Sequence, residues 1–198
     1  MKHESIVVMI LSAKSEEVVS LKEAVEAVES TARRVALLHL AYARTLMDEL
    51  GEKKGRELIT KAIREFGVRI GEKTKQEVIA QGLKPTVENF GAGKSYAVPR
   101  FGMSERGEIT KTMDETRGRV YGCTLAKVWK EYGEEKLGRL YCYVDPAKFM
   151  GYDLNYKQIH TKTVLDDNEC CEMMMRRTTE KERRDFTDKK SDWLYIDK

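Results

Sequence analysis

"TARRVALLHLAYARTLMDELG", residues 31–51, decides the fold class of this chain. Its apolar residues continue a three- and four-residue spacing that starts upstream and predicts one helix over residues 15–50. Between Val35 and Leu46 the apolar positions spread over most sides of the helix, which is typical of a buried helix. His39 lies in this segment and is expected to be a hydrogen-bonded core residue, and Gly51 is expected to end the helix.

The elements that follow change from helix to strand. A second helix is predicted over 54–81, with a break or a close helix contact at Gly67 and Gly71, and Gly82 and Pro85 end it. The later predictions are a strand at 108–121, a short helix at 124–132, and a hairpin of strands 158–165 and 170–178.

Helices followed by strands indicate an α+β fold, with long N-terminal helices packed on a small C-terminal antiparallel sheet and a short cysteine-bearing helix. We expect one domain over 1–198, with a helical scaffold at 1–85 and a strand-rich half at 86–198 that carries the site. The segment "DWLYI" near the end is expected to dock as a terminal strand or helix edge.

Charge and hydropathy restrict the partners. The chain has 198 residues, of which 35% are charged, and 36 basic against 33 acidic side chains are interleaved along it. A nucleic-acid-binding protein usually segregates its basic residues, so none is expected as a partner. No apolar run approaches the length of a membrane span, and "IVVMIL" at 6–11 is too short for a signal peptide. We expect a cytoplasmic protein that acts on a small molecule, with a homo-oligomer possible through the helical half.

Four cysteines are expected to be reduced thiols in that compartment. Cys170 and Cys171 are adjacent, which is poor geometry for a disulfide, and no C-x-x-C spacing indicates a zinc finger. "GAGKS" at 91–95 is not a phosphate loop, because Glu88 replaces the first glycine of that motif. No cofactor is therefore expected.

Two stretches place thiols, a carboxylate and an imidazole in one half of the chain. They are "GCTLAKVWKEYGEEKLGRLYCYVD" (122–145) and "HTKTVLDDNECCEM" (160–173). Alternation along the last strand puts Cys171, Met173 and Met175 on one face. We hypothesise that this face meets the first stretch, so that Cys171 shares a pocket with Cys123 and Cys142, and that Asp145 and His160 lie nearby.

These stretches resemble the L-2-amino-thiazoline-4-carboxylic acid hydrolase family over residues 115–175. The positions that follow the family's order are Cys123, Gly133, Cys142, Asp145, Thr163, Asp167 and Cys171. Four positions depart from it: Asp166 replaces a glycine, Glu172-Met173 replaces Asp-Phe, and His160 stands where arginine is frequent. A substrate different from the namesake is therefore open.

The resemblance implies hydrolytic opening of a thiazoline ring at its amidine-like carbon, which gives a carbamoyl-cysteine. The candidate catalytic residues are Cys123, Cys142, Asp145 and His160. Cys123 precedes a helix whose dipole favours a thiolate; Asp145 would orient a base or hold the leaving nitrogen, and His160 would be that base. The candidate substrate-binding residues are Cys171, Thr163 and Arg176, the last for a substrate carboxylate.

Other interpretations stay open from the residues alone. Each thiol can be core filler, Asp145 can cap a helix that begins at Pro146, and His160 can face solvent. A non-catalytic domain of the 4-vinyl reductase type would use the same pocket to bind a small hydrophobe or metabolite. A redox protein, or a zinc site of three thiolates with His160 or Asp145, is the third alternative.

Overall fold

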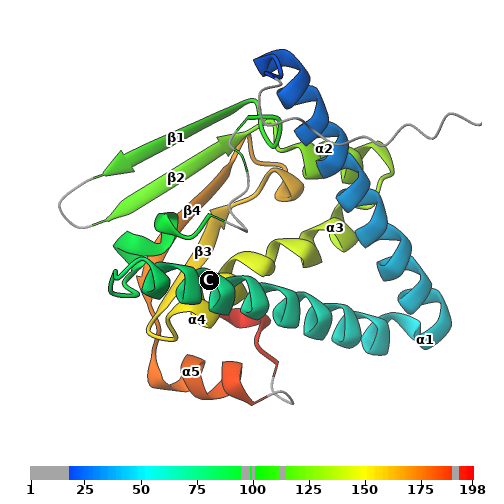
Figure 1. Ribbon diagram of the computed structural model, residues 1–198. Coiled ribbons are helices and arrows are strands. Elements are labelled where there is room, and N and C mark those ends of the chain that lie inside the picture. The colour runs from blue at the N-terminus through cyan, green and yellow to red at the C-terminus, as the bar shows by residue number, and fades with distance from the viewer. Residues whose placement is uncertain (1–17, 95–98, 100, 112–114, 189–191) are drawn as a thin grey trace, which may run out of the picture.

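The computed structural model describes residues 18–198 except 95–98, 100, 112–114 and 189–191. The expectations for residues 6–11 and for the first residues of the long helix fall outside this part of the chain. Helix α1 (Leu21–Ala80) begins after Ser20 with a capping box, in which the Ser20 hydroxyl and the Glu23 carboxylate each accept a backbone N–H. At Gly51 the backbone leaves helical geometry (φ 74°) and α1 turns back on itself (Figure 1). The predicted end at Gly51 is confirmed, since only glycine adopts this conformation readily.

The second arm of α1 packs closely on α4 (Val144–Tyr152). No break occurs at Gly67 or Gly71; both permit close helix contact instead. A Cβ on Gly67 would lie 2.5 Å from the Ala147 Cβ, and one on Gly71 would lie 2.6 Å from the Tyr152 backbone nitrogen. A side chain larger than hydrogen at either position would therefore push α4 away.

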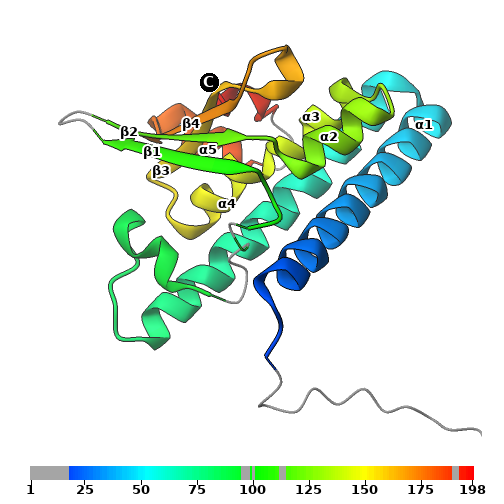
Figure 2. The same ribbon diagram turned by 90° about the horizontal axis from the view of Figure 1, so that it is seen from above.

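In the described part of the chain, four antiparallel strands form one sheet in the order β1-β2-β4-β3 (Figure 1), which Figure 2 shows from above, nearly edge-on. They are β1 (Arg106–Lys111), β2 (Thr116–Tyr121), β3 (Tyr156–Lys162) and β4 (Cys171–Arg177). The hairpin predicted from the last third is confirmed as β3 and β4. The single strand predicted at 108–121 is wrong, because the chain reverses there and pairs Gly107 with Val120.

The second half of the chain holds more helix than was predicted. Besides α2 (Thr124–Glu131), it contains α3 (Glu135–Cys142), α4 and α5 (Glu180–Thr187). Short 3-10 helices are η1 (Val87–Ala92), η2 (Val164–Asp166) and η3 (Leu194–Ile196). The fold is α+β, as expected, but α4 lies between the long helix and strand β3.

Two apolar clusters hold these elements together. In the first, Trp129 is almost fully buried, donates its indole N–H to the Ala36 carbonyl at 3.2 Å, and packs with His39 of α1. His39 is 8% exposed and 2.9 Å from the Leu137 carbonyl oxygen, which confirms it as a hydrogen-bonded core residue.

The second cluster joins Ala147 and Met150 of α4 to Phe186, Trp193 and Ile196. The docking expected for "DWLYI" is thus confirmed as the short helix η3, and Figure 1 shows this red segment beside α4.

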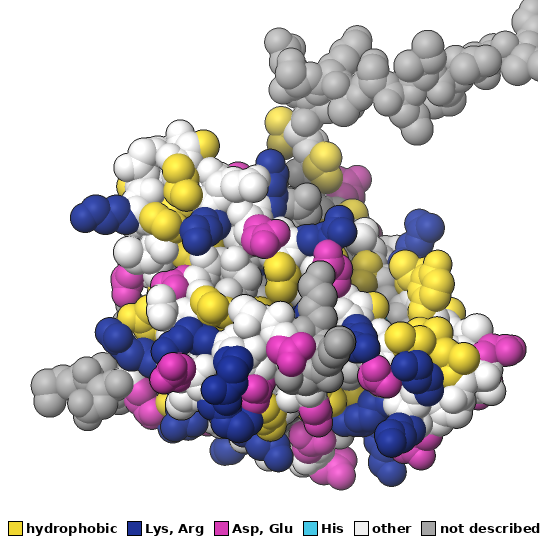
Figure 3. Space-filling model, turned by 90° about the horizontal axis from the view of Figure 1, so that it is seen from below, with side chains coloured by type: hydrophobic (Ala, Val, Ile, Leu, Met, Phe, Trp, Pro, Cys, Tyr) yellow, Lys and Arg dark blue, Asp and Glu magenta, His cyan; other side chains and the backbone are white. Residues whose placement is uncertain are grey.

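Charged side chains cover the surface without separation by sign. On the face shown in Figure 3, Lys and Arg lie among Asp and Glu. Among the described residues, no helix has the length and apolar character needed to cross a membrane.

Candidate active site

The candidate site lies where α2, α3, α4, β3 and β4 meet. Cys123 is the N-cap of α2, Cys142 ends α3, and Asp145 stands in the first turn of α4. His160 and Cys171 come from the paired strands β3 and β4. Electrostatic interactions link the Cys142 thiol with Asp145, Cys123 and Cys171, so these groups lie close together. The structure brings these residues together as hypothesised, but neither of the two pockets described below is lined by one of the three thiols.

Asp145 is held between two cations and is not the cap of its helix. The N-cap of α4 is Tyr143, and the Asp145 side chain is 21% exposed. Its Oδ1 accepts from Lys148 Nζ at 2.7 Å, and its Oδ2 lies 3.4 Å from His160 Nε2. Burial opposes ionisation, but Lys148 and His160 outweigh it and hold the pKa of Asp145 well below its ordinary range. The carboxylate is therefore charged at neutral pH.

His160 lies between two carboxylates. Its Nδ1 is 3.0 Å from Asp197 Oδ1, opposite the contact between Nε2 and Asp145, and its side chain is only 4% exposed. Burial lowers the pKa of His160, but the hydrogen bonds to Asp145 and Asp197 outweigh it and raise that pKa to about 9. The imidazolium is favoured at neutral pH, so this side chain donates protons rather than accepting them, unlike the base expected from the sequence.

The three thiols are neutral in this environment. Burial raises the pKa of Cys123, while the N–H groups of Leu125 and Ala126 at the start of α2 lower it by less. Burial also raises the pKa of Cys142 well above its ordinary value and that of Cys171 to about 11. The helix-start effect predicted for Cys123 is present, but desolvation outweighs it, so the expected lowering of a thiol pKa does not occur.

The remaining sequence-predicted residues are not all at the cluster. Thr163 is buried and donates its hydroxyl to Asp166 Oδ2 at 3.0 Å, so it holds the turn before β4. Arg176 is exposed and lies five residues beyond Cys171 on the opposite face of β4. The structure therefore separates Arg176 from the thiols.

Four residues beside the cluster were missed from the sequence. Asp197 comes from the distant end of the chain, and Arg139 donates Nη2 to Asp197 Oδ2 at 2.6 Å. Lys148 follows Asp145 by three residues, a spacing that would have indicated a pair had α4 been predicted. Burial and the nearby Asp145 raise the pKa of Tyr141 to about 12, which leaves its hydroxyl protonated.

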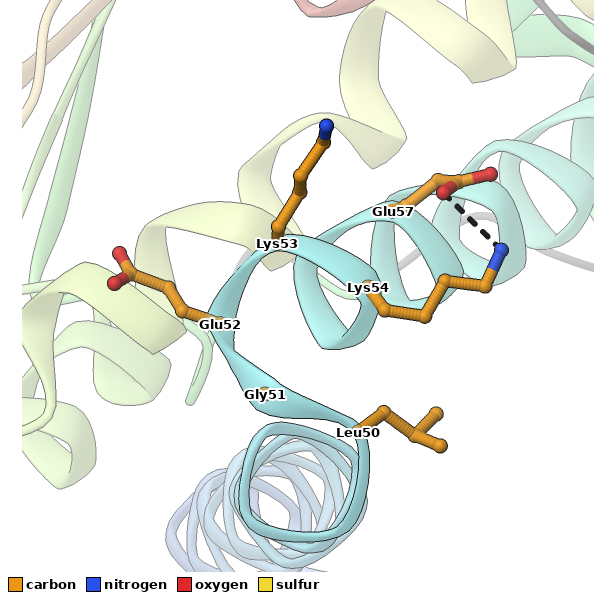
Figure 4. Close-up of a pocket in the computed structure, with 6 residues that line it drawn as sticks. All are labelled: Leu50, Gly51, Glu52, Lys53, Lys54 and Glu57. Atoms are coloured by element: carbon orange, nitrogen blue, oxygen red, sulfur yellow. Dashed lines mark hydrogen bonds and ion pairs between the residues drawn. The ribbon is translucent and has the colours of Figure 1, made fainter.

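Two pockets in the described part of the chain differ in their position relative to the cluster. One of about 320 Å³ lies at the bend of α1, where Figure 4 shows Leu50, Glu52 and Lys53 spreading away from each other. A larger pocket of about 470 Å³ is lined by Arg139, Tyr143 and Asp166, among others. Only the second pocket reaches a residue of the hydrogen-bonded network.

A metal site is not formed by the groups that the structure places. Among the described residues, no three His, Cys, Asp or Glu side chains are arranged to hold a metal ion.

Comparison with protein families matched residues 30–175 to the description L-2-amino-thiazoline-4-carboxylic acid hydrolase. The chain belongs to this family. The match covers most of α1 as well as the thiol-bearing half, so membership extends beyond the stretch from which it was inferred. Searches of curated proteins and of solved structures each found no match. Asp145, His160 and the three clustered cysteines all lie inside the matched region, whereas Asp197 lies outside it.

Proposed function

We propose that this family member is a hydrolase that opens a C–N or C–S bond in a small cyclic amidine or thiazoline-like acid. One observation supports the proposal: Asp145 is ionised and contacts His160, whose two ring nitrogens each face a carboxylate. The family to which the chain belongs is named for this hydrolysis. An ionised carboxylate suits a cationic amidinium substrate through its charge, while its two oxygens keep their contacts with Lys148 and His160.

Water is the nucleophile in this proposal, because burial keeps the three thiols protonated. For a thiazoline, the water oxygen adds to the amidine carbon and its proton is taken up at Asp145. The bond from that carbon to the ring sulfur then breaks and His160 gives a proton to the departing sulfur, while the hydroxyl on the carbon becomes the carbonyl and releases its proton to solvent. The product is a carbamoyl-substituted cysteine, and the proton held by Asp145 returns to His160, directly or through solvent. Cys123, Cys142 and Cys171 line the site.

Arg139 is the cation that we assign to the substrate carboxylate in place of Arg176. Its Nη1 is buried and has no hydrogen-bond partner among the described residues, although its Nη2 binds Asp197. A buried N–H without a partner is costly, and a carboxylate ligand would satisfy it. Arg139 also lines the pocket of about 470 Å³ next to the network, which offers an approach from solvent.

The test is turnover of 2-amino-thiazoline-4-carboxylate and related cyclic amidine acids by purified protein and by Asp145→Asn. Loss of the carboxylate should lower kcat by about a hundredfold or more, the usual contribution of a general acid–base group. Asp48→Asn is the matched control, because Asp48 is exposed on the first arm of α1. Chromatography and mass spectrometry would identify the product.

A non-catalytic binding domain predicts another result. In that case no cyclic amidine acid is turned over, yet one raises the melting temperature of both the wild type and Asp48→Asn. Equal turnover by wild type and Asp145→Asn would remove Asp145 from the chemistry.

A further inference from the structure

The segment around η3 reaches the candidate site through one side chain, Asp197. Its Oδ1 accepts the His160 backbone N–H at 2.8 Å and lies 3.0 Å from His160 Nδ1. Its Oδ2 lies 3.1 Å from the same ring nitrogen and accepts from Arg139 Nη2 at 2.6 Å. The side chain is 1% exposed. A single carboxylate thus binds strand β3 by its backbone, the imidazole of the same residue, and a guanidinium from α3.

The hydrogen bonds determine the state of the imidazole. Nδ1 faces Asp197 and Nε2 faces Asp145, and ionised carboxylates only accept hydrogen bonds. Both ring nitrogens must therefore carry a proton to satisfy both contacts. If Asp197 were absent, Nδ1 would have no carboxylate partner, and the ring could rotate or lose that proton.

Asp197 is one of two charged groups that determine the protonation of the His160 imidazole. Asp145 acts from α4 and is itself paired with Lys148, and Asp197 acts from the η3 segment and is paired with Arg139. These two carboxylates are the charged partners of the imidazole, and both favour its cationic form.

Packing fixes the segment that carries Asp197. Trp193 is 3% exposed and makes edge contacts with Tyr143 and Phe186, with ring centroids 5.8 and 5.7 Å apart. Ile196 is fully buried, and Lys157 Nζ of β3 donates to its carbonyl at 2.8 Å. The segment covers β3, which is an edge strand of the sheet. A segment held this rigidly can position a side chain, which a frayed terminus could not.

We propose that Asp197 is a positioning residue of the active site, which fixes the orientation and the proton content of His160 from outside the region that the family comparison matches. It does not touch the substrate; it acts through His160. The kinetic part of this inference rests on the proposed hydrolase function, whereas the part that concerns the state of His160 does not.

The test is Asp197→Asn, with Asp192→Asn from the same segment as the matched control. Nitrogen-15 NMR of the imidazole signals needs no substrate, and the signals of His160 are identified by their loss in His160→Gln. In the wild type both nitrogens of His160 should stay protonated through neutral pH. In Asp197→Asn the midpoint of its titration should fall by about one pH unit or more, as expected when one of two carboxylate partners loses its charge.

Kinetics provides the second measurement if a substrate is turned over. The alkaline limb of the kcat profile should move to lower pH in Asp197→Asn by the same interval as the NMR midpoint, and Asp197→Glu should restore part of it. An unchanged His160 titration with a lower melting temperature would overturn the proposal, because Asp197 would then only cover the sheet edge. If no substrate is found, the NMR shift still decides the inference while the hydrolase proposal fails on its own.

Discussion

The two described histidines occupy regions that are alike in burial and opposite in chemistry. His39 sits in the helical core, with a backbone carbonyl as its hydrogen-bond partner and the rings of Trp129 and Tyr141 around it. His160 sits at the junction of helices and sheet, between two carboxylates. Burial lowers the pKa of His39, and nothing beside it outweighs that effect, whereas the carboxylates raise the pKa of His160 to about 9. The number of contacting anions, not the depth of burial, separates a structural histidine from a candidate catalytic one.

The largest expected difference appears when each ring is removed. His160→Leu leaves Asp145 and Asp197 close together without the cation between them, which should lower the free energy of unfolding by about 3 kcal/mol at pH 7. His39→Leu loses one hydrogen bond in an apolar region and should cost about 1 kcal/mol. Urea unfolding of both variants measures the two values. An equal loss of unfolding free energy in the two variants would show that the carboxylates around His160 do not distinguish it from His39.

The pH dependence of stability should have opposite signs for the two histidines. The folded pKa of His160 lies above the unfolded value, so its contribution is complete below about pH 6.5 and is lost as the pH rises towards 9, on the order of 3 kcal/mol. The folded pKa of His39 lies below the unfolded value, so its contribution is present above about pH 6.5 and is lost as the pH falls below it.

Unfolding free energies from pH 5 to 10 for the wild type and the two leucine variants would show this. The alkaline loss should be absent from His160→Leu and kept in His39→Leu. An alkaline limb of the same size in both variants would mean that other groups cause it.

The smallest expected effect concerns the reactivity of the thiols in the cluster around His160. Burial raises the pKa of Cys142, and the charge of Asp145 raises it further. Iodoacetamide labelling should therefore be slow at pH 7, accelerate with rising pH, and become several-fold faster in Asp145→Asn, because a negative charge near the thiol is removed. Mass spectrometry of peptides gives the rate for each cysteine, with Asp48→Asn as control. Fast labelling of wild-type Cys142 at pH 7 would restore the thiolate nucleophile.

Periodicity located the bend of α1 and the last hairpin, but it was wrong about the burial of the first arm of α1, where Leu37, Leu38 and Tyr42 are exposed. The apolar spacing that ends at Gly51 and the turn residues between β3 and β4 each leave a signal in a short window. The reversal between β1 and β2 was missed because its strands alternate only weakly. Helices α3 and α4 were missed because their apolar faces are short and they follow one another almost without a break.

The residues of the candidate site likewise fall into those that a local pattern could predict and those that it could not. Cys123, Cys142, Asp145 and Cys171 could be named from motif order, since they lie in two short stretches of the chain. Asp197 could not, because it reaches His160 through the packing of Trp193 and Ile196, which no local pattern reports. Arg176 was chosen for its charge, but the alternation of β4 places it on the other face from Cys171.

The close contact between α1 and α4 means that the position of Asp145 depends on residues that touch no reactant. Gly67 and Gly71 lie on the outer helix, yet the backbone of α4 rests against them. A mutational scan scored by activity alone would mark both glycines as intolerant positions and could place them in the active site. Scored by abundance as well, the same scan should separate them from Asp145, because a side chain on either glycine would displace α4, whereas we expect an amide at Asp145 to keep the scaffold in place.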